Sequence, residues 1–102
     1  MALDLNVVKR GTECELRMVG HLDAVTAPGA QEAMLLLSEQ YDSIILNFAE
    51  LSYISSAGLR ALKAIRTAMR KKNGNLALKG VSKEVMEIFE VTGFAGLFQY
   101  VS

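Results

Sequence analysis

The stretch that decides the fold is residues 44–60, IILNFAELSYISSAGLR. Its first part, Ile44-Ile45-Leu46, is too short and too uniformly apolar for an amphipathic helix, and its β-branched residues favour a strand covered on both faces at the sheet centre. At its end, two adjacent serines and a glycine stand where a helical pattern begins. A serine hydroxyl at the start of a helix faces free backbone N–H groups and the positive end of the helix dipole, so a phosphate would be accommodated there. Ser56 is therefore the first candidate for a functional residue.

Upstream of this stretch, the pattern predicts two strands and a helix. Residues 3–8 are mostly apolar and residues 13–19 alternate, which predicts two strands joined around Gly11. Thr26-Ala27-Pro28 predicts a helix start, with the Thr26 side chain as the N-cap and Pro28 in the first turn. The apolar positions of this helix recur at helical spacing and are Ala30, Ala33, Met34 and Leu37.

Downstream, two further helices alternate with strands. Leu59, Leu62, Ile65 and Met69 form a helical stripe that Asn73-Gly74 ends. A buried strand over residues 76–78, a helix capped by Ser82 and ended by Gly93, and a last strand near residues 97–100 follow. The order β-β-α-β-α-β-α-β predicts an α/β fold with a mainly parallel central sheet and helices packed against it. Residues 1–102 are expected to form a single domain.

Composition excludes several classes of function. The 102 residues carry 11 basic and 11 acidic side chains, so the charge pattern of a nucleic-acid binder is missing. The single Cys14 has no internal disulfide partner, and no Cys/His cluster predicts a metal or cofactor site, which fits a reducing cytoplasm. The N-terminus has no leader pattern and the apolar runs are too short to span a membrane. A monomer is expected, because no apolar face is left over.

Two motifs together resemble a known family. GHLDAVTAP, residues 20–28, and ILNFAELSYISSAGL, residues 45–59, resemble the signatures of the STAS domain, named for sulfate transporters and anti-sigma factor antagonists. The resemblance covers the whole chain and is nearest to the stand-alone bacterial members. It implies that the unphosphorylated form binds an anti-sigma factor, itself a serine kinase, and so releases the sigma factor. Phosphorylation by that kinase ends the binding, and a phosphatase acting on the phosphoserine resets it.

The same resemblance implies roles for individual residues. Alignment on Gly58-Leu59 makes Ser56 the phosphorylated residue. Asp23 matches an acidic residue of the family that is expected close to the phosphorylation site, as a partner or kinase contact. The remaining residues expected at the partner interface are Thr26, Ser55, Ala57 and Gly58.

The chain departs from the family pattern at two positions. Asn47 and Ser55 stand where many members carry aspartate, so both changes are expected to remove negative charge near Ser56. They would alter which kinase is recognised, or move the modification to Ser55.

Simpler structural interpretations remain open for several residues. Ser55 is the better candidate for the helix cap, and Asp23 also fits a turn residue that bonds its own backbone. Gly58 fits a close approach between elements that excludes a Cβ. His21 is interpreted as a solvent-facing spacer. The basic cluster Arg66, Arg70, Lys71 and Lys72 is interpreted as a solvated helix end.

The same residues suggest two other classes of function, an enzyme and a static docking protein. An exposed serine at a strand-to-helix turn suggests a hydrolase nucleophile, but the G-x-S-x-G pattern is missing and the one histidine lies in a different loop. Neither Gly-rich phosphate loop is found. We therefore expect no enzyme activity. The nearer alternative is a STAS scaffold or transporter-associated subunit that docks without phosphorylation; the presence of Ser56 favours the switch.

Overall fold

Five strands form one mixed sheet in the computed structural model, which describes residues 2–101. The strands are β1 (Leu3–Arg10), β2 (Glu13–Leu22), β3 (Ser43–Ile54), β4 (Asn75–Lys79) and β5 (Gln99–Val101). The helices are α1 (Ala27–Gln40), α2 (Ser56–Lys71) and α3 (Lys83–Thr92), and a short 3₁₀ turn η1 (Ala95–Leu97) precedes β5. The element order is the one that the sequence predicts.

The sheet has the spatial order β1-β2-β3-β4-β5, with β3 at its centre as expected. β1 and β2 are antiparallel and turn at Gly11, whose φ of 60° lies in the left-handed region that glycine tolerates. The β2–β3, β3–β4 and β4–β5 pairs are all parallel, so the sheet is mainly parallel. The two N-terminal strands are longer than predicted, because their pairing continues past the alternating residues.

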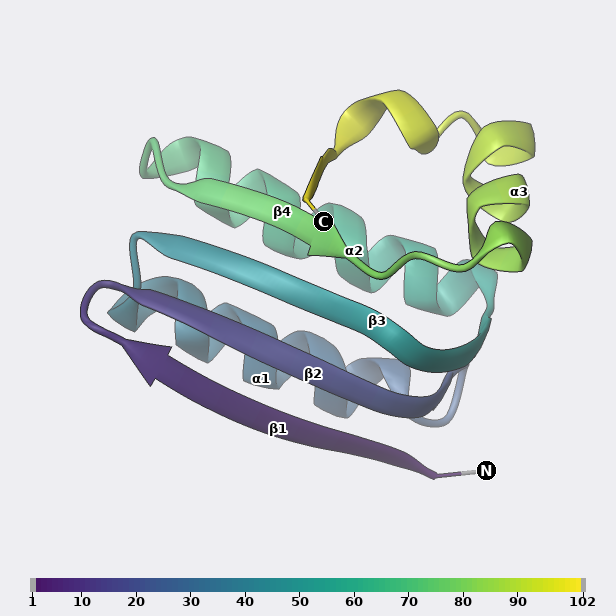
Figure 1. Cartoon of the computed structure of the whole chain (residues 1–102), viewed down its shortest axis with the longest axis horizontal. Coiled ribbons are helices and arrows are strands. Elements are labelled where there is room, and N and C mark those ends of the chain that lie inside the picture. The colour runs from purple at the N-terminus through teal and green to yellow at the C-terminus, as the bar shows by residue number, and fades with distance from the viewer. Residues whose placement is uncertain (1, 102) are drawn as a thin grey trace.

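Helices α1 and α2 lie on the same face of the sheet (Figure 1). Each new strand after β2 is added on the same side of the previous one, and right-handed crossovers then bring both connecting helices to one face. The expectation that the central strand is covered on both faces is therefore wrong. Leu46 and Phe48 are buried towards the helices, whereas Ile45 and Asn47, on the other face, are half-buried.

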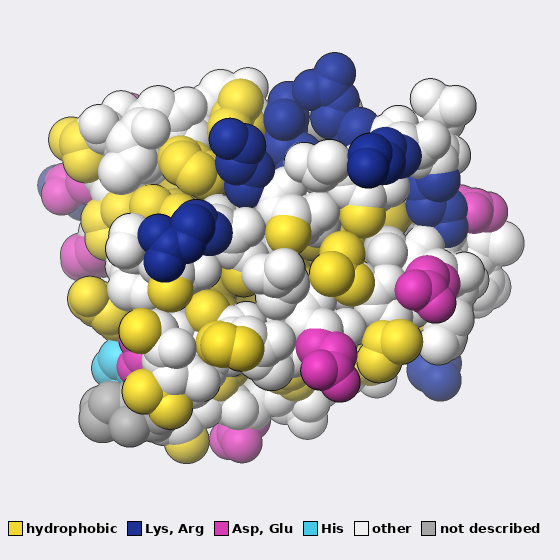
Figure 2. Space-filling view, turned by 180° about the vertical axis from the view of Figure 1, so that it is seen from behind, with side chains coloured by type: hydrophobic (Ala, Val, Ile, Leu, Met, Phe, Trp, Pro, Cys, Tyr) yellow, Lys and Arg dark blue, Asp and Glu magenta, His cyan; other side chains and the backbone are white. Residues whose placement is uncertain are grey.

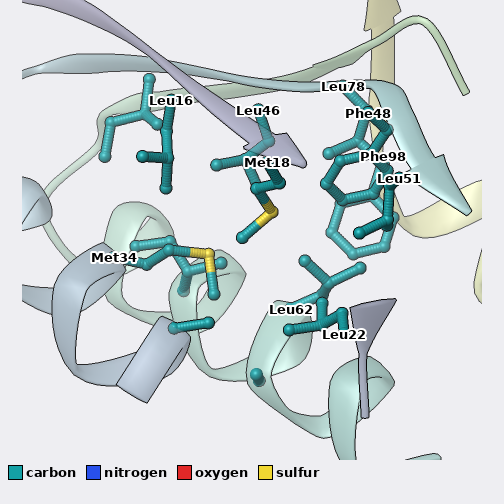
Figure 3. Close-up of a cluster of buried hydrophobic side chains, with 14 of the residues drawn as sticks. Leu16, Met18, Leu22, Met34, Leu46, Phe48, Leu51, Leu62, Leu78 and Phe98 are labelled. Carbon is teal, nitrogen blue, oxygen red and sulfur yellow. The ribbon is translucent and has the colours of Figure 1, made fainter. Parts of the chain in front are cut away.

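The core fills the space between the sheet and the helices (Figure 3). Met18 and Leu46 from the strands meet Met34 of α1 and Leu62 of α2, and all four are fully buried. The predicted stripe of α2 is buried along its whole length. Phe89 of α3 packs on Phe98 with ring centroids 5.9 Å apart and closes the core beside β4.

The helix ends also follow the predicted signals. The Ser82 hydroxyl accepts the Val85 N–H at the start of α3, and Gly93 ends that helix with a φ of 79°. Asn73 has a φ of 58°, and the Gly74 N–H donates to the Met69 carbonyl after α2. Among residues 2–101, none of the helices has both the length and the apolar character needed to cross a membrane.

Candidate functional site

The junction between β3 and α2 is built around Ser55. Its backbone is extended (φ −103°, ψ 177°), and its hydroxyl accepts the Gly58 N–H at 3.4 Å. Its own N–H donates to the Leu22 carbonyl at 2.9 Å, which fastens the junction to the end of β2. The interpretation of Ser55 as the helix cap is confirmed.

Ser56 is the first residue of α2 and is exposed. Because Ser55 supplies the cap, the Ser56 hydroxyl is not needed to hold the helix start. The first N–H groups of a helix have no partner within it, and the dipole is positive there, so a phosphoryl group on Ser56 meets a favourable local field. Ser56 thus combines the exposure that a kinase requires with a position where a phosphoryl group is tolerated.

The loop between β2 and α1 is held by two reciprocal side chains. The Asp23 carboxylate accepts the N–H groups of Val25 at 2.9 Å and Thr26 at 3.0 Å. The Thr26 hydroxyl accepts the Asp23 N–H at 2.9 Å and donates to the His21 carbonyl at 2.7 Å. The interpretation of Asp23 as a turn residue is thus confirmed.

These contacts correct the prediction that the Thr26 side chain caps α1. The hydroxyl turns back into the loop because the Asp23 N–H and the His21 carbonyl take both of its bonding directions, and the Thr26 backbone is itself near-helical (φ −91°, ψ −22°). The pKa of Asp23 is lowered, chiefly by the hydrogen bond from the Thr26 backbone and then by that from Val25. The carboxylate is therefore ionised at neutral pH.

Gly58 brings this loop and the start of α2 together. A Cβ at this position would lie 2.8 Å from the Leu22 carbonyl oxygen and 2.8 Å from Cγ1 of Ile54. The interpretation of Gly58 as a site of close approach is confirmed, and its burial leaves it little surface to offer a partner. Since Leu22 directly precedes Asp23, the motifs at residues 20–28 and 45–59 meet at the carboxyl ends of β2 and β3.

His21 differs from its sequence interpretation. It is half-buried rather than solvent-facing, and its ring packs against Tyr53, its register partner on β3, with centroids 6.0 Å apart. Among the expected interface residues, Ala57 is partly exposed beside Ser56.

Asn47 lies in a different cluster from the one expected. Its side-chain amide donates to Glu15 at 2.9 Å, and its oxygen accepts the Ala49 N–H, both on the sheet face that points away from α1 and α2. Arg10 and Lys79 also approach Glu15, at 3.1 and 3.8 Å. The pKa of Glu15 is lowered, first by the Asn47 hydrogen bond and then by that from Arg10. The expectation that Asn47 alters the charge next to Ser56 is wrong, because Asn47 lies seven residues before the end of β3 and its side chain bonds Glu15.

The basic cluster at the end of α2 is only partly solvated. Lys72 donates to the carbonyls of Ser38 and Tyr41 and pairs with Asp42 at 3.6 Å, so it holds the end of α1. The Nε of Arg66 donates to the Leu97 carbonyl at 2.8 Å. Arg70 and Lys71 are exposed as interpreted, whereas Arg66 and Lys72 also hold backbone carbonyls of neighbouring elements.

A groove of about 650 Å³ between α1 and α2 was not foreseen from the sequence. It begins beside Ser56, because Ala57 and Arg60 form its α2 wall. Its lining is mainly apolar and includes Leu35 and Leu36 of α1. The helical spacing of Ser56 and Arg60, one turn apart, is the sequence signal that would have drawn Arg60 into the site.

Comparison with known proteins finds one family whose model matches almost the whole chain. The model of the family described as STAS domain matches residues 4–101. The anti-sigma-B factor antagonist of Bacillus subtilis (strain 168) is 25% identical over 93 residues, which are 91% of this chain and 85% of that protein.

Solved structures show the same fold. The unphosphorylated form of the anti-sigma factor antagonist SpoIIAA matches with a TM-score of 0.75 at 20% identity, over 99% of this chain and 88% of that one. The phosphorylated form of SpoIIAA, a Bacillus cell fate determinant, has the same TM-score and identity over 99% of this chain and 92% of that one. Because the family model spans almost every residue, the chain belongs to the STAS domain family.

Proposed function

We propose that this protein is an anti-sigma factor antagonist switched by phosphorylation of Ser56. Unphosphorylated, it binds an anti-sigma factor that is also a serine kinase, and the sigma factor is released. The observation that carries the proposal is that the two serines at the start of α2 have different roles: Ser55 caps the helix, and Ser56 is exposed. The antagonists among its relatives and the two forms of SpoIIAA support it.

The assignment of the modification to Ser56 rather than Ser55 follows from the cap. A phosphoryl group on Ser55 would replace the hydroxyl that accepts the Gly58 N–H, in a half-buried position. On Ser56 it meets solvent on one side and the helix start on the other. The modification thus adds charge without disturbing the fold.

The switch acts through the charge of the phosphate. A phosphoryl group adds about two negative charges and three strong acceptors at one point of the surface. If it costs about 3 kcal/mol of binding energy through desolvation and repulsion, affinity falls roughly a hundredfold. The ionised Asp23 of the neighbouring loop adds to the negative potential that the partner meets.

We further propose that the protein acts in the cytoplasm by binding and not by catalysis. The histidine that a serine nucleophile would need as its base, His21, packs against Tyr53 and belongs to the β2 strand end. A separate phosphatase restores the unphosphorylated form. The alternative of a static scaffold predicts the same surface without modification.

The test uses the serine-kinase anti-sigma factors encoded in the genome that carries this protein, each purified and titrated against the full-length chain by calorimetry. We expect one of them to bind and, with ATP, to add one phosphate at Ser56, located by peptide mass spectrometry. Ser56→Ala should bind but not switch, whereas Ser56→Asp should bind weakly. A partner that binds but phosphorylates neither serine would establish the scaffold alternative instead.

A further inference from the structure

Ser56 stands at the head of a straight ridge of exposed residues on α2. The ridge consists of Ser56, Arg60, Lys63, Thr67, Arg70 and Lys71, all of them exposed. At 3.6 residues per turn these positions fall within an arc of about 100°, and at 1.5 Å per residue they extend over about 22 Å. The ridge is therefore one continuous surface feature that starts at the switch residue.

The ridge is strongly basic in a chain whose net charge is zero. Helix α2 carries five Lys and Arg residues and no Asp or Glu. Within residues 2–101 the ion pairs use Arg10, Arg17, Lys72 and Lys79, so the ridge cations have no acidic partner there. Lys and Arg side chains gather over the upper part of the helix face, where α2 runs (Figures 1 and 2).

The groove between α1 and α2 runs beside this ridge. Arg60 belongs to both features, since it lines the groove from the α2 side. The lining is mainly apolar, and its apolar residues include Leu36 of α1, which exposes 51% of its surface. The opposite wall carries the exposed acidic residues Glu32 and Glu39 of α1. The surface thus offers an apolar track with cations on one side and anions on the other.

We infer that the ridge and groove form the docking surface for an amphipathic helix of the partner protein, whose acidic side chains face Arg60 and Lys63. The inference rests on the proposed function for the identity of the partner. An apolar track of this kind fits the apolar stripe of a helix, and the cation wall fits acidic residues beside that stripe. Glu32 and Glu39 disfavour a uniform polyanion such as DNA or an anionic membrane, because it would meet repulsion from the α1 wall.

This arrangement also explains why a phosphate at Ser56 would oppose binding. Residues four apart lie on the same side of a helix, so Arg60 is within reach of a phosphoryl group on Ser56. The phosphate would draw Arg60 away from the partner and would repel the partner's acidic residues. The same cation then serves the docked state before phosphorylation and the released state after it.

The test measures the affinity of the full-length protein for the anti-sigma factor kinase identified by calorimetry, at low and at physiological salt. The variant is Arg60→Glu combined with Lys63→Glu. The control is Lys9→Glu combined with Lys83→Glu, which makes the same charge change at exposed positions on β1 and α3. We expect the ridge variant to lose roughly tenfold or more in affinity, mainly in association rate, and the control to stay within about twofold. Circular dichroism verifies that both variants are folded.

A reversal of one acidic residue of the partner helix to lysine should restore binding to the ridge variant. Equal affinity of ridge and control variants for a kinase that binds the wild type would overturn the inference and leave the proposed function intact. If the wild type binds no kinase, the proposed function fails, and the docking inference fails with it.

Three further measurements separate other occupants of the surface. Sedimentation of the chain alone tests a second copy, vesicles with 30% phosphatidylglycerol test a membrane, and a 20-base-pair DNA duplex tests nucleic acid. Binding in any of these that Arg60→Glu/Lys63→Glu abolishes would assign the ridge to that occupant and overturn the inference.

Discussion

Replacement of Gly58 by alanine sets two opposing effects against each other at the site. Glycine within a helix costs about 1 kcal/mol relative to alanine, so helix propensity alone predicts that Gly58→Ala stabilises the protein. The added Cβ, however, would lie 2.8 Å from the Leu22 carbonyl oxygen, 2.8 Å from Cγ1 of Ile54 and 2.9 Å from Cγ of Leu22. Real contacts of a Cβ are longer than this, so something must move.

The backbone contact decides which effect wins. The Leu22 carbonyl oxygen already accepts the Ser55 N–H at 2.9 Å, so it cannot retreat without weakening the junction that positions Ser56. Overpacking of a buried site typically costs about 1–3 kcal/mol, and a rigid contact belongs in the upper part of that range. Set against the propensity gain, a net destabilisation of about 1–2 kcal/mol is expected.

The assay is urea and thermal unfolding followed by far-UV circular dichroism. For a domain of this size, each kcal/mol lowers the Tm by about 4–8 °C. Gly29→Ala is the matched control, because this glycine lies within α1 and a Cβ there would meet nothing within 4 Å in the described part of the chain. The control should gain about 0.5–1 kcal/mol. If Gly58→Ala proved as stable as the wild type or more stable, the close approach of α2 to Leu22 would be refuted.

The remaining predictions address polar contacts. Ser55→Ala should lower the free energy of unfolding in urea by about 1 kcal/mol, because the helix cap is lost, whereas Ser56→Ala should leave the unfolding midpoint unchanged. Equal losses in the two variants would contradict the assignment of the cap to Ser55 alone. Asn47→Asp places a carboxylate against Glu15 and should cost about 1–2 kcal/mol at pH 7, with a smaller loss at more acidic pH, where protonation relieves the repulsion; a loss independent of pH would argue against the contact. Asp23→Ala should destabilise the β2–α1 loop, whereas Asp23→Asn keeps the acceptor oxygen. Because the folded-state pKa of Asp23 is lowered, its contribution is complete above about pH 3.9 and is lost as the pH falls through the lower folded value. Acid titration of wild type and Asp23→Asn should then show a steeper loss of stability for the wild type.

Features set by nearby residues were predictable from the sequence alone. The α2 stripe, the Ser82 cap and the helix ends at Asn73-Gly74 and Gly93 depend on neighbours within a turn or two, and all were found where predicted. The exposure of Ser56 and its place at a helix start were predictable for the same reason, since both are properties of a local strand-to-helix junction, whereas its modification stays a prediction.

Features that depend on register between distant segments needed the tertiary structure. Glu15 and Asn47 lie 32 residues apart and meet only because β2 and β3 pair in parallel, and Lys72 reaches the end of α1 across 31 to 34 residues. Local patterns cannot say which of several polar groups a side chain will find, as Thr26 shows by bonding the loop rather than the helix. The groove beside Ser56 likewise exists because two right-handed crossovers place α1 and α2 on one face, a packing result that neither helix encodes by itself.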